Sequence, residues 1–398
     1  MRVGVVGTGF VARGLIRALA AAGDEFTVTR VLTRRDPRGV SGVPRDLLTR
    51  STADLVEHAD VLFEASGDAV HGTDVLLEAF AAGRPVVTMD SELQVTTGSW
   101  FAARGVLTEA DGDQPGCLAR LADEAVGMGF RPLAYLNLKG FLDPDPTPES
   151  MAHWSERQDL RLEQTVSFTD GSKLQAEQVL VANGLGASIA REGLLGPTVE
   201  SPADAGALVE AARRLGQPLS DYLLWRGGPP GVLLLADHPE AAALPGYLPF
   251  SRLFVGDDRP CFSLVRPHHL IHLEAVRTLR DVRDGRPPLL NNGPRPRYGL
   301  AAVTKRPLAA GAEIERGVGS FDVRGTAVRL ADRPDHVPAT LLAGARVRAD
   351  LPRGHVVRFE DVELRPCAAL ELYREVLALA LRPAEPVVRP ATDEARAA

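Results

Sequence analysis

The chain has 398 residues, with 45 basic against 52 acidic side chains (net charge −7), 45% hydrophobic residues and 24% charged residues. This composition is that of a globular protein with room for two or three domains. The mild negative charge excludes a general electrostatic attraction to nucleic acid or to an anionic membrane surface, so we expect neither as a partner.

The first 140 residues alternate strands with helices. An apolar run at 3–6 ends in glycines, and apolar residues recur at helical spacing over 10–22, which predicts a strand, a tight turn and a helix. Such alternation favours an α/β fold with a parallel, doubly wound sheet of the Rossmann type. Further strands are expected at 26–33, 61–65, 85–89, 105–108 and 132–136, and helices at 52–58, 72–82 and 116–128.

The remaining chain divides at two Pro-rich linkers. The acidic connector FLDPDPTPES after Gly140 cannot continue a helix or a central strand, so the first domain is expected to be 1–140. An α+β catalytic or oligomerisation domain is expected at 141–297, with helices at 172–185, 203–215 and 270–284 and strands at 231–235 and 261–265. Short strand-like runs with turn signals predict a small all-β module at 298–366, and 367–398 is expected to form a helix and a disordered tail.

The cysteines and the N-terminal sequence indicate the cellular compartment in which the protein is expected. Cys117, Cys261 and Cys367 form no CxxC pair, which argues against a disulfide framework or a structural zinc site. The opening MRVGVVGTGF lacks the pattern of a signal peptide, and no stretch has the apolar length of a membrane span. We expect a cytoplasmic protein.

The turn after the first expected strand carries a dinucleotide-binding motif. It reads GTGFVA at 7–12, a G-x-G-x-x-A pattern between a strand and a helix. Gly7 allows the tight turn, Gly9 lets the backbone approach a pyrophosphate, and Ala12 allows close helix packing. The helix N-terminus offers free N–H groups to phosphates. The residues predicted to bind the cofactor here are Gly7, Thr8, Gly9, Phe10 and Val11.

The second expected strand ends in Arg34 and Arg35, where an NAD enzyme usually carries Asp or Glu for the ribose hydroxyls. Two guanidinium groups favour a 2′-phosphate, so we expect NADP rather than NAD. The alternative is two ordinary surface arginines in an Arg-rich chain. Ser66 and Gly67 follow the third strand and Glu92 follows the fourth, and we expect these loops to border the nicotinamide.

Only three of the 45 basic residues are lysines, namely Lys139, Lys173 and Lys305. An ammonium group can shift its pKa and move a proton, whereas a guanidinium stays charged. Function is therefore expected at Lys139 and Lys173 more than at Lys305. The alternative is that a few lysines survive by chance.

Four residues are predicted to be catalytic. Asp113 opens a helix and Lys139 leaves a strand expected at the same sheet edge, so both can converge on the cofactor. An ammonium there can polarise a carbonyl and protonate the alkoxide that forms. Lys173 and Glu177 are four positions apart on one helical face. The alternative for this pair is a surface i,i+4 salt bridge.

Three further residues are predicted to bind substrate. Arg266 precedes two histidines and can clamp a carboxylate or phosphate, and His269 can shuttle protons. Asn183 lies further along the helix of Lys173. His268, His269 and His272 have no companion carboxylates at metal-ligand spacing, so no metal is expected.

Together these motifs resemble a known family, the homoserine-dehydrogenase-like oxidoreductases with a C-terminal SAF (β-clip) domain, a group that includes 1-deoxy-D-xylulose-5-phosphate reductoisomerase-like enzymes. The resemblance implies a Rossmann domain that binds NADP, a catalytic domain similar to that of homoserine dehydrogenase, homo-oligomerisation and a SAF module. It covers nearly the whole chain, through GTGFVARGL, VLTRR, DVLFEASG, GRPVVTMDSE, GDQPG, SFTDGSKLQAEQ, LVRPHHLIHLEA, TKRPLAAGAEIE and PRGHVVRFEDVEL.

Two segments depart from the pattern of this family. Its usual Asn-Val-Glu-Ala-Asp run reads DSELQ here, which keeps Glu92 but replaces the second acid by Gln94. Its turn with two lysines (GKGK) reads LNLKG here, so only Lys139 remains. The loss of one acid and one cation predicts a less charged substrate, or one held in another way.

These observations predict an NADP-dependent oxidoreductase that acts on a small polyhydroxylated or carboxylated carbonyl or alcohol, with reductoisomerisation as one form of the reaction. Two alternatives stay open. One is a redox-neutral isomerase or lyase that uses a bound nicotinamide transiently, and the other is a non-catalytic dinucleotide-binding sensor. The expected partners are a small-molecule substrate and further copies of the chain.

Overall fold

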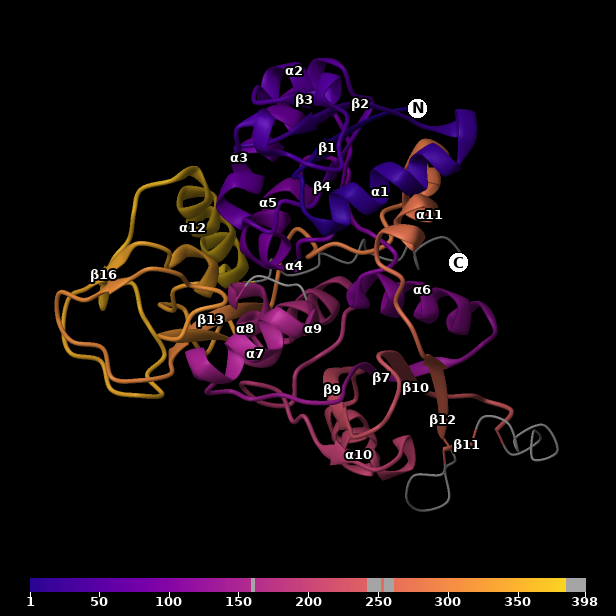
Figure 1. Cartoon of the computed structure of the whole chain (residues 1–398). Coiled ribbons are helices and arrows are strands. Elements are labelled where there is room, and N and C mark those ends of the chain that lie inside the picture. Colours follow the sequence, from indigo (N-terminus) through magenta and orange to yellow (C-terminus); the bar gives the residue numbers. More distant parts are fainter. Residues whose placement is uncertain (159–161, 242–251, 254–260, 384–398) are drawn as a thin grey trace, which may run out of the picture.

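The computed structural model describes residues 1–158, 162–241, 252–253 and 261–383 (Figure 1). Its first sheet has six parallel strands in the order β3-β2-β1-β4-β5-β6. This is the strand order of dinucleotide-binding folds, with the reversal point at β1. The strands are β1 (Arg2–Val6), β2 (Thr27–Leu32), β3 (Leu48–Thr49), β4 (Val61–Glu64), β5 (Val86–Thr88) and β6 (Leu107–Glu109).

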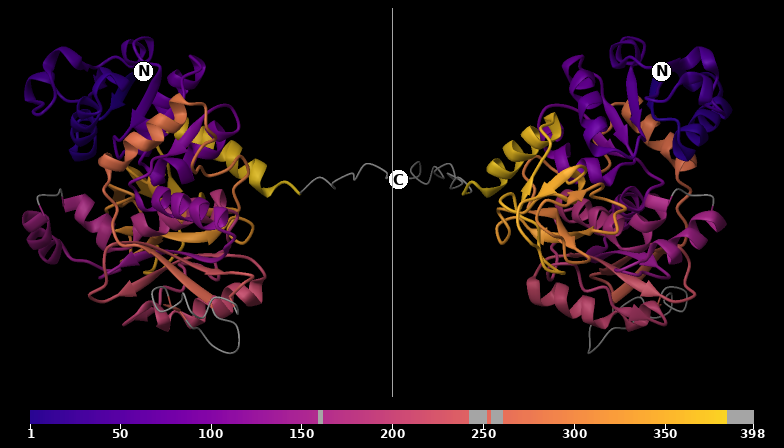
Figure 2. Two further views of the ribbon diagram at one scale, coloured as in Figure 1. Left: turned by 90° about the vertical axis from the view of Figure 1, so that its right-hand side faces the viewer. Right: turned by 60° about the vertical axis from the view of Figure 1, so that its left-hand side comes forward.

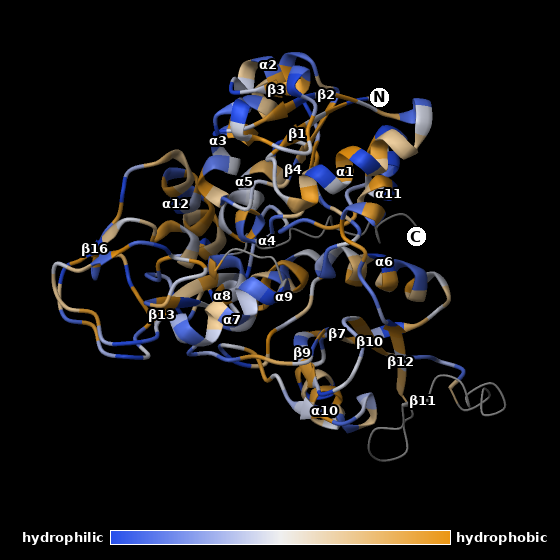
Figure 3. Ribbon diagram, in the orientation of Figure 1, coloured by the Kyte–Doolittle hydropathy of each residue, from blue (hydrophilic) through white to orange (hydrophobic). Residues whose placement is uncertain are grey.

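Helices cover both faces of this sheet, which explains why its strands are continuous apolar runs. Hydrophobic residues are concentrated in these strands (Figure 3), and Val3, Val5, Phe63 and Val87 are fully buried. The doubly wound α/β prediction is thus confirmed. The helices are α1 (Phe10–Ala21), α2 (Thr52–Glu57), α3 (Ala69–Ala81), α4 (Ser91–Leu93) and α5 (Ser99–Ala102).

The second sheet is mixed, in the order β11-β12-β10-β7-β9-β8. One face packs against α6 (Gln114–Gly127) and α9 (Ser172–Gly184), and the other against α10 (Gly206–Leu215). This is the α+β arrangement expected after the first sheet. The strands are β7 (Arg131–Lys139), β8 (Thr198–Val199), β9 (Leu219–Trp225), β10 (Gly231–Asp237), β11 (Arg252–Leu253) and β12 (Cys261–Arg266).

The strand expected at 132–136 is present as β7, but it lies in the centre of the second sheet. It pairs with β10 and β9 and with no strand of the first sheet among the described residues. A buried apolar strand has the same sequence pattern in either sheet, so the pattern could not show which sheet it joins. Helix α6 connects β6 of the first sheet to β7 of the second. The domain limits at 140, 297 and 366 stay predictions.

The sequence analysis missed one helical pair and the packing of one expected helix. The connector after Gly140 is followed by a helical pair, α7 (Pro148–Gln158) and α8 (Leu162–Thr169). After β12, helix α11 (His272–Arg283) returns to the first sheet and packs along α1, as Figure 1 shows. Ala275 and Leu279 of α11 are buried in the core of the first sheet.

The segment predicted to be a small all-β module forms two antiparallel sheets among the described residues. From it, α12 (Ala368–Leu381) packs against α3 and α5 (Figure 2), and Tyr373 is hydrogen-bonded to His336 at 2.8 Å. The predicted tail from 384 onward lies outside the described residues. Of the helices that the structure describes, none is long and apolar enough to cross a membrane. The strands are β13 (Tyr298–Thr304), β14 (Glu313–Ile314), β15 (Val323–Arg329), β16 (Ala345–Val347) and β17 (Val362–Glu363).

Candidate active site

The glycine turn after β1 fits the pyrophosphate of a dinucleotide. Gly7 has a φ of +106°, and a Cβ there would lie 2.8 Å from the carbonyl oxygen of Ala65, so only glycine fits. A Cβ on Gly9 would meet no atom within 4 Å, which leaves room for a ligand beside the backbone. No side chain caps the N-terminus of α1, so its first N–H groups are free to bind an anion.

Arg34 and Arg35 lie exposed just beyond β2, at the edge of the sheet that carries the glycine turn. Arg34 is ion-paired with Asp68 at 2.8 Å and remains 61% exposed. The backbone N–H of Arg35 donates to the Thr33 hydroxyl at 3.2 Å, so its guanidinium is not part of that bond. Both cations therefore follow the strand next to the one that leads into the glycine turn.

The loop after β4 is held by a buried carboxyl group that sequence reasoning missed. Glu64 accepts a 2.7 Å hydrogen bond from the backbone N–H of Ser66 and a 2.8 Å bond from the hydroxyl of Thr88. Burial raises the pKa of Glu64. Gly67, which follows Ser66, has a φ of +65°. The carboxyl thus fixes the Ser66–Gly67 turn predicted to border the cofactor.

The four residues predicted to be catalytic meet between the two sheets. The Lys173 ammonium lies 3.0 Å from Oδ2 of Asp113 and 3.0 Å from Oε1 of Glu177. The Lys139 ammonium donates to Oε1 of Gln114 at 2.9 Å and lies 4.0 Å from Oε2 of Glu177. Asp113 and Gln114 stand at the start of α6, Lys139 ends β7, and the other two lie on α9. We call this group the lysine cluster.

Two amide side chains that the sequence analysis did not select complete the lysine cluster. Gln114 donates to Oδ1 of Asn137 at 2.7 Å, and Asn137 donates to Oε2 of Glu177 at 2.6 Å. A chain of hydrogen bonds therefore runs from Lys139 through both amides to the carboxylate. The available signal was a polar Asn137 within the apolar strand YLNLK, since a buried amide needs partners.

The two lysines of the cluster differ electrostatically. Burial lowers the pKa of Lys139, and Glu177 only partly opposes this. Burial acts in the same direction on Lys173, but the carboxylates of Asp113 and Glu177 outweigh it and raise the pKa of Lys173 well above its usual value. Lys173 is therefore a fixed cation, whereas Lys139 is the better proton donor.

Two carboxyl groups in the electrostatic field of Lys173 have raised pKa values. Burial raises the pKa of Glu92 on α4 to about 8, although Lys173 opposes the shift. Burial, reinforced by Glu64, raises the pKa of Asp90 to about 7. Glu92, predicted as a cofactor-binding residue, thus lies in the electrostatic field of the lysine cluster. Asp90 Oδ1 caps α4 through the backbone N–H of Leu93 at 2.9 Å.

Gln94, one of the departures from the family pattern, has a clear structural partner. It lies buried in a π-helical turn (Gln94–Gly98) and donates to Oε2 of Glu109 at 2.5 Å. Burial raises the pKa of Glu109 well above its usual value. A second acid in place of Gln94 would bring two buried carboxyl groups together, so the neutral amide suits this position.

Arg266, the predicted clamp for an anionic substrate, is paired with two carboxylates of the chain itself. Its guanidinium lies 2.9 Å from Oδ1 of Asp111, contacts Glu274 and is only 14% exposed. A cation already paired with two carboxylates is not a free clamp for an anionic substrate. The sequence could not show this, because Asp111 is 155 positions away from Arg266 in the chain.

Asn183 and His269 also lie outside the lysine cluster. Asn183 donates to the carbonyl oxygen of Tyr298 at 3.0 Å and accepts from the backbone N–H of Arg297 at 2.9 Å, so its amide binds the β module. It is ten residues from Lys173, about 15 Å along the helix. His269 is half-buried, and no hydrogen bond joins it to the cluster within the described part of the chain.

One group of side chains has the composition of a metal site without suiting one. Ligand atoms of Asp111, Cys117 and Glu274 lie within 4.8 Å of one another. Arg266 pairs with both carboxylates, and Arg120 lies 3.4 Å from Asp111. Burial raises the pKa of the Cys117 thiol, which disfavours the thiolate that binds metals. This group is an ion-pair network.

Two family models match parts of this chain. Residues 112–275 match the catalytic domain of oxidoreductase DRL, and residues 2–79 match a model described as "NADP oxidoreductase coenzyme F420-dependent". The matched segments contain the lysine cluster and the glycine turn, respectively. With the strand order of the first sheet, they define the protein as an NAD(P)-dependent oxidoreductase. A search of curated proteins finds no match.

Solved structures show a more distant likeness. An oxidoreductase from Thermotoga maritima is 15% identical, with a TM-score of 0.42, over 73% of this chain and 91% of that chain. UDP-N-acetylglucosamine 3-dehydrogenase from Acidithiobacillus ferrooxidans is 14% identical, with a TM-score of 0.41, over 73% of this chain and 92% of that chain. At TM-scores below 0.5, this likeness carries no conclusion about substrate.

Proposed function

We propose that the protein is an NADP-dependent oxidoreductase that reduces or oxidises a small polyhydroxylated compound, with skeletal isomerisation, as in reductoisomerases, as one form of the reaction. The observation that carries this proposal is the lysine cluster, in which Lys139 has a lowered pKa beside the fixed cation Lys173. The cluster lies next to loops at the carboxyl edge of the first sheet, where ligands bind in such folds.

Each residue of the cluster has a proposed task. A bound nicotinamide supplies or accepts the hydride. The Lys139 ammonium polarises the substrate carbonyl and delivers a proton to the alkoxide oxygen. Gln114, bonded to the same ammonium at 2.9 Å, aims it. Glu177 and Asp113 hold Lys173 as a cation and so fix the arrangement of the cluster around Lys139.

The cations near the site are already paired with carboxylates of the chain, and this supports a polyhydroxylated substrate over a carboxylated one. Arg266, the expected anion clamp, is paired with Asp111 and Glu274, and Lys173 is paired with two carboxylates of the cluster. A phosphate or carboxylate on the substrate would thus have to displace a buried pair, which is costly. Hydroxyl groups, by contrast, can donate to buried carboxylates without adding charge.

The NADP preference is supported by Arg34 and Arg35, whose exposed guanidiniums follow β2. We also propose, from the resemblance to homoserine-dehydrogenase-like proteins, that the β module is a SAF domain and that the protein forms homo-oligomers. Size-exclusion chromatography with light scattering tests the second of these points: a monomer at micromolar concentration would overturn it.

The test of the proposed function is oxidation of NADPH by the purified protein, followed at the nicotinamide absorbance. A matched pair of substrates, 1-deoxyxylulose and its 5-phosphate, is offered together with other keto sugars, sugar acids and aspartate semialdehyde. We expect turnover of an unphosphorylated sugar, with a higher kcat/KM than its phosphate. NADPH binding without turnover of any candidate would favour the redox-neutral or sensor alternatives instead. The carbon skeleton of the product, determined by NMR, separates simple reduction from isomerisation.

A further inference from the structure

The third lysine of the chain is buried next to the helix that carries the second. Lys305 follows β13 in the β module and is only 3% exposed. Its ammonium lies 2.5 Å from Oδ2 of Asp170 and donates to the carbonyl oxygen of Ser320 at 2.5 Å. Asp170 stands two positions before the first residue of α9 and three positions from Lys173. The pair therefore joins the β module to the turn that begins the active-site helix.

Hydrogen bonds from the β module fix the same helical turn. The backbone N–H of Gly325 donates to the Ser172 hydroxyl at 2.8 Å, and that of Ala327 donates to the Gln175 side chain at 2.9 Å. Both donors belong to β15. Asp170 uses its other oxygen to accept from the backbone N–H of Ser172 at 2.8 Å. One side of α9 thus binds the β module, while Lys173 points to the cluster.

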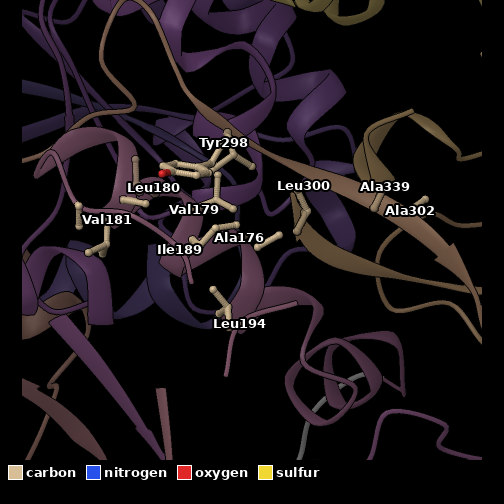
Figure 4. Packing of buried hydrophobic residues seen from close by; sticks show 14 of the residues in the cluster. Ala176, Val179, Leu180, Val181, Ile189, Leu194, Tyr298, Leu300, Ala302 and Ala339 are labelled. Carbon is tan, nitrogen blue, oxygen red and sulfur yellow. The ribbon is translucent and has the colours of Figure 1, made fainter. Parts of the chain in front are cut away.

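Apolar packing extends this interface along α9. Ala176, Val179 and Leu180 of the helix lie in one buried cluster with Tyr298 and Leu300 of β13, and Figure 4 shows these side chains side by side. The module also touches the first sheet's loops, because the hydroxyls of Thr96 and Thr340 are 2.7 Å apart. The β module is therefore packed directly behind the elements that build the site.

A buried ion pair is a means of fixing position more than of gaining stability. Bringing both charges out of water costs about as much as their attraction returns, yet removing one partner leaves an uncompensated buried charge. The pair therefore restricts the Asp170 turn to arrangements in which its carboxylate meets Lys305. The turn contains Gly171 in the left-handed region, with a φ of +86°.

We propose that Lys305 is a positioning residue of the active site: through its buried pair with Asp170, the β module sets the first turn of α9 and thereby the place of the Lys173 ammonium. The inference rests on the proposed function, because that function gives Lys173 its role in the active site. The contacts of Lys305 and Asp170 themselves involve no substrate. It assigns the β module a structural task in building the site.

The low lysine content makes this inference directly measurable. Lysine labelled with ¹³C at Cε gives one NMR signal for each of the three lysines, and each is assigned by its loss in a single variant. We expect Lys305→Met to shift the Lys173 signal, while NADPH affinity, measured by fluorescence, stays unchanged because the glycine turn is untouched. Asp170→Asn, which keeps the bond between Lys305 and Ser320, should shift the same signal and provides the readout if Lys305→Met does not fold.

Arg333→Met is the matched control, because Arg333 also joins the β module to the second domain, through Glu192 at 2.7 and 3.0 Å. It should leave the Lys173 signal in place. An unmoved Lys173 signal in folded Lys305→Met or Asp170→Asn would overturn the proposal, and so would an equal shift in Arg333→Met, which would indicate general loosening. Absence of turnover in the substrate panel would count against the proposed function without changing this result.

Discussion

The side-chain amide of Asn137 donates a 2.6 Å hydrogen bond to Oε2 of Glu177, and both residues are fully buried. One lies on β7 and the other on α9, so the bond ties the second sheet to the active-site helix. A buried carboxylate needs all its strong acceptors paired. Asn137 therefore supplies one of the hydrogen-bond donors that the buried Glu177 side chain needs.

We first predict that Asn137→Leu destabilises the protein. The substitution keeps the number and branching of the side-chain heavy atoms, but it removes the hydrogen-bond donor to Oε2 of Glu177 and the Oδ1 acceptor of the Gln114 amide. Unsatisfied buried polar groups cost about 1–3 kcal/mol each, so the free energy of unfolding should fall by at least about 1 kcal/mol. Urea unfolding followed by circular dichroism measures it. A variant as stable as the wild type would show that water or rearrangement satisfies both groups.

A second prediction concerns Lys139. Lys139→Ala should keep NADPH affinity, because its ammonium bonds to Gln114 and not to the glycine turn, yet it should abolish turnover. Loss of a general acid costs about 10²–10⁴-fold in rate. Arg131→Ala, an exposed cation at the start of the same strand, is the control and should behave like the wild type. Full activity of Lys139→Ala would remove this residue from the mechanism.

Much of the first sheet could be predicted from local patterns alone. The glycine turn, the apolar strands and the helices between them each depend on neighbouring residues. By contrast, the place of β7 in the second sheet depends on pairing with β10, about 100 positions later. Periodicity carries no information about such pairing. The helical pair after Gly140 was missed because its Pro-rich start resembles a linker.

The candidate site was predictable to the same degree. Lys139 and Lys173 stood out because the chain has so few lysines, and the structure brings them to the same carboxylate. The ion pairs of Arg266 could not be predicted, because residue type shows what a side chain can bind, whereas only the fold shows what it already binds. Asp111 and Glu274 occupy its guanidinium.

A third prediction concerns cofactor preference. Replacing Arg34 and Arg35 together by Ser should weaken NADPH binding by at least about tenfold, since charge-assisted hydrogen bonds contribute about 1.5–3 kcal/mol. NADH binding should change little, because NADH lacks the 2′-phosphate. Fluorescence titration with both nucleotides measures the two affinities, again with Arg131→Ala as control. Equal weakening of both nucleotides would reject these arginines as the 2′-phosphate site.

The last prediction concerns the pH dependence of stability, which Glu92 should influence. Burial raises its pKa from 4.5 to about 8, so between these pH values the folded protein holds a proton that the unfolded chain has released. The folded state then binds more protons, and its free energy of unfolding falls as pH rises through this window. The contribution is fully present below about pH 4.5 and is lost above about pH 8.

The Gln side chain of Glu92→Gln has the shape of the neutral carboxyl group but cannot ionise. The part of the fall in the free energy of unfolding that is due to Glu92 should therefore be absent in this variant. The stability of the variant relative to the wild type should therefore increase steadily from about pH 4.5 to about pH 8 and then level off. Taking the difference between the two proteins cancels the many other titrating groups that they share. Urea unfolding at intervals of one pH unit supplies the curves. A flat difference for Glu92→Gln would show that this carboxyl group is ionised in the folded protein at neutral pH.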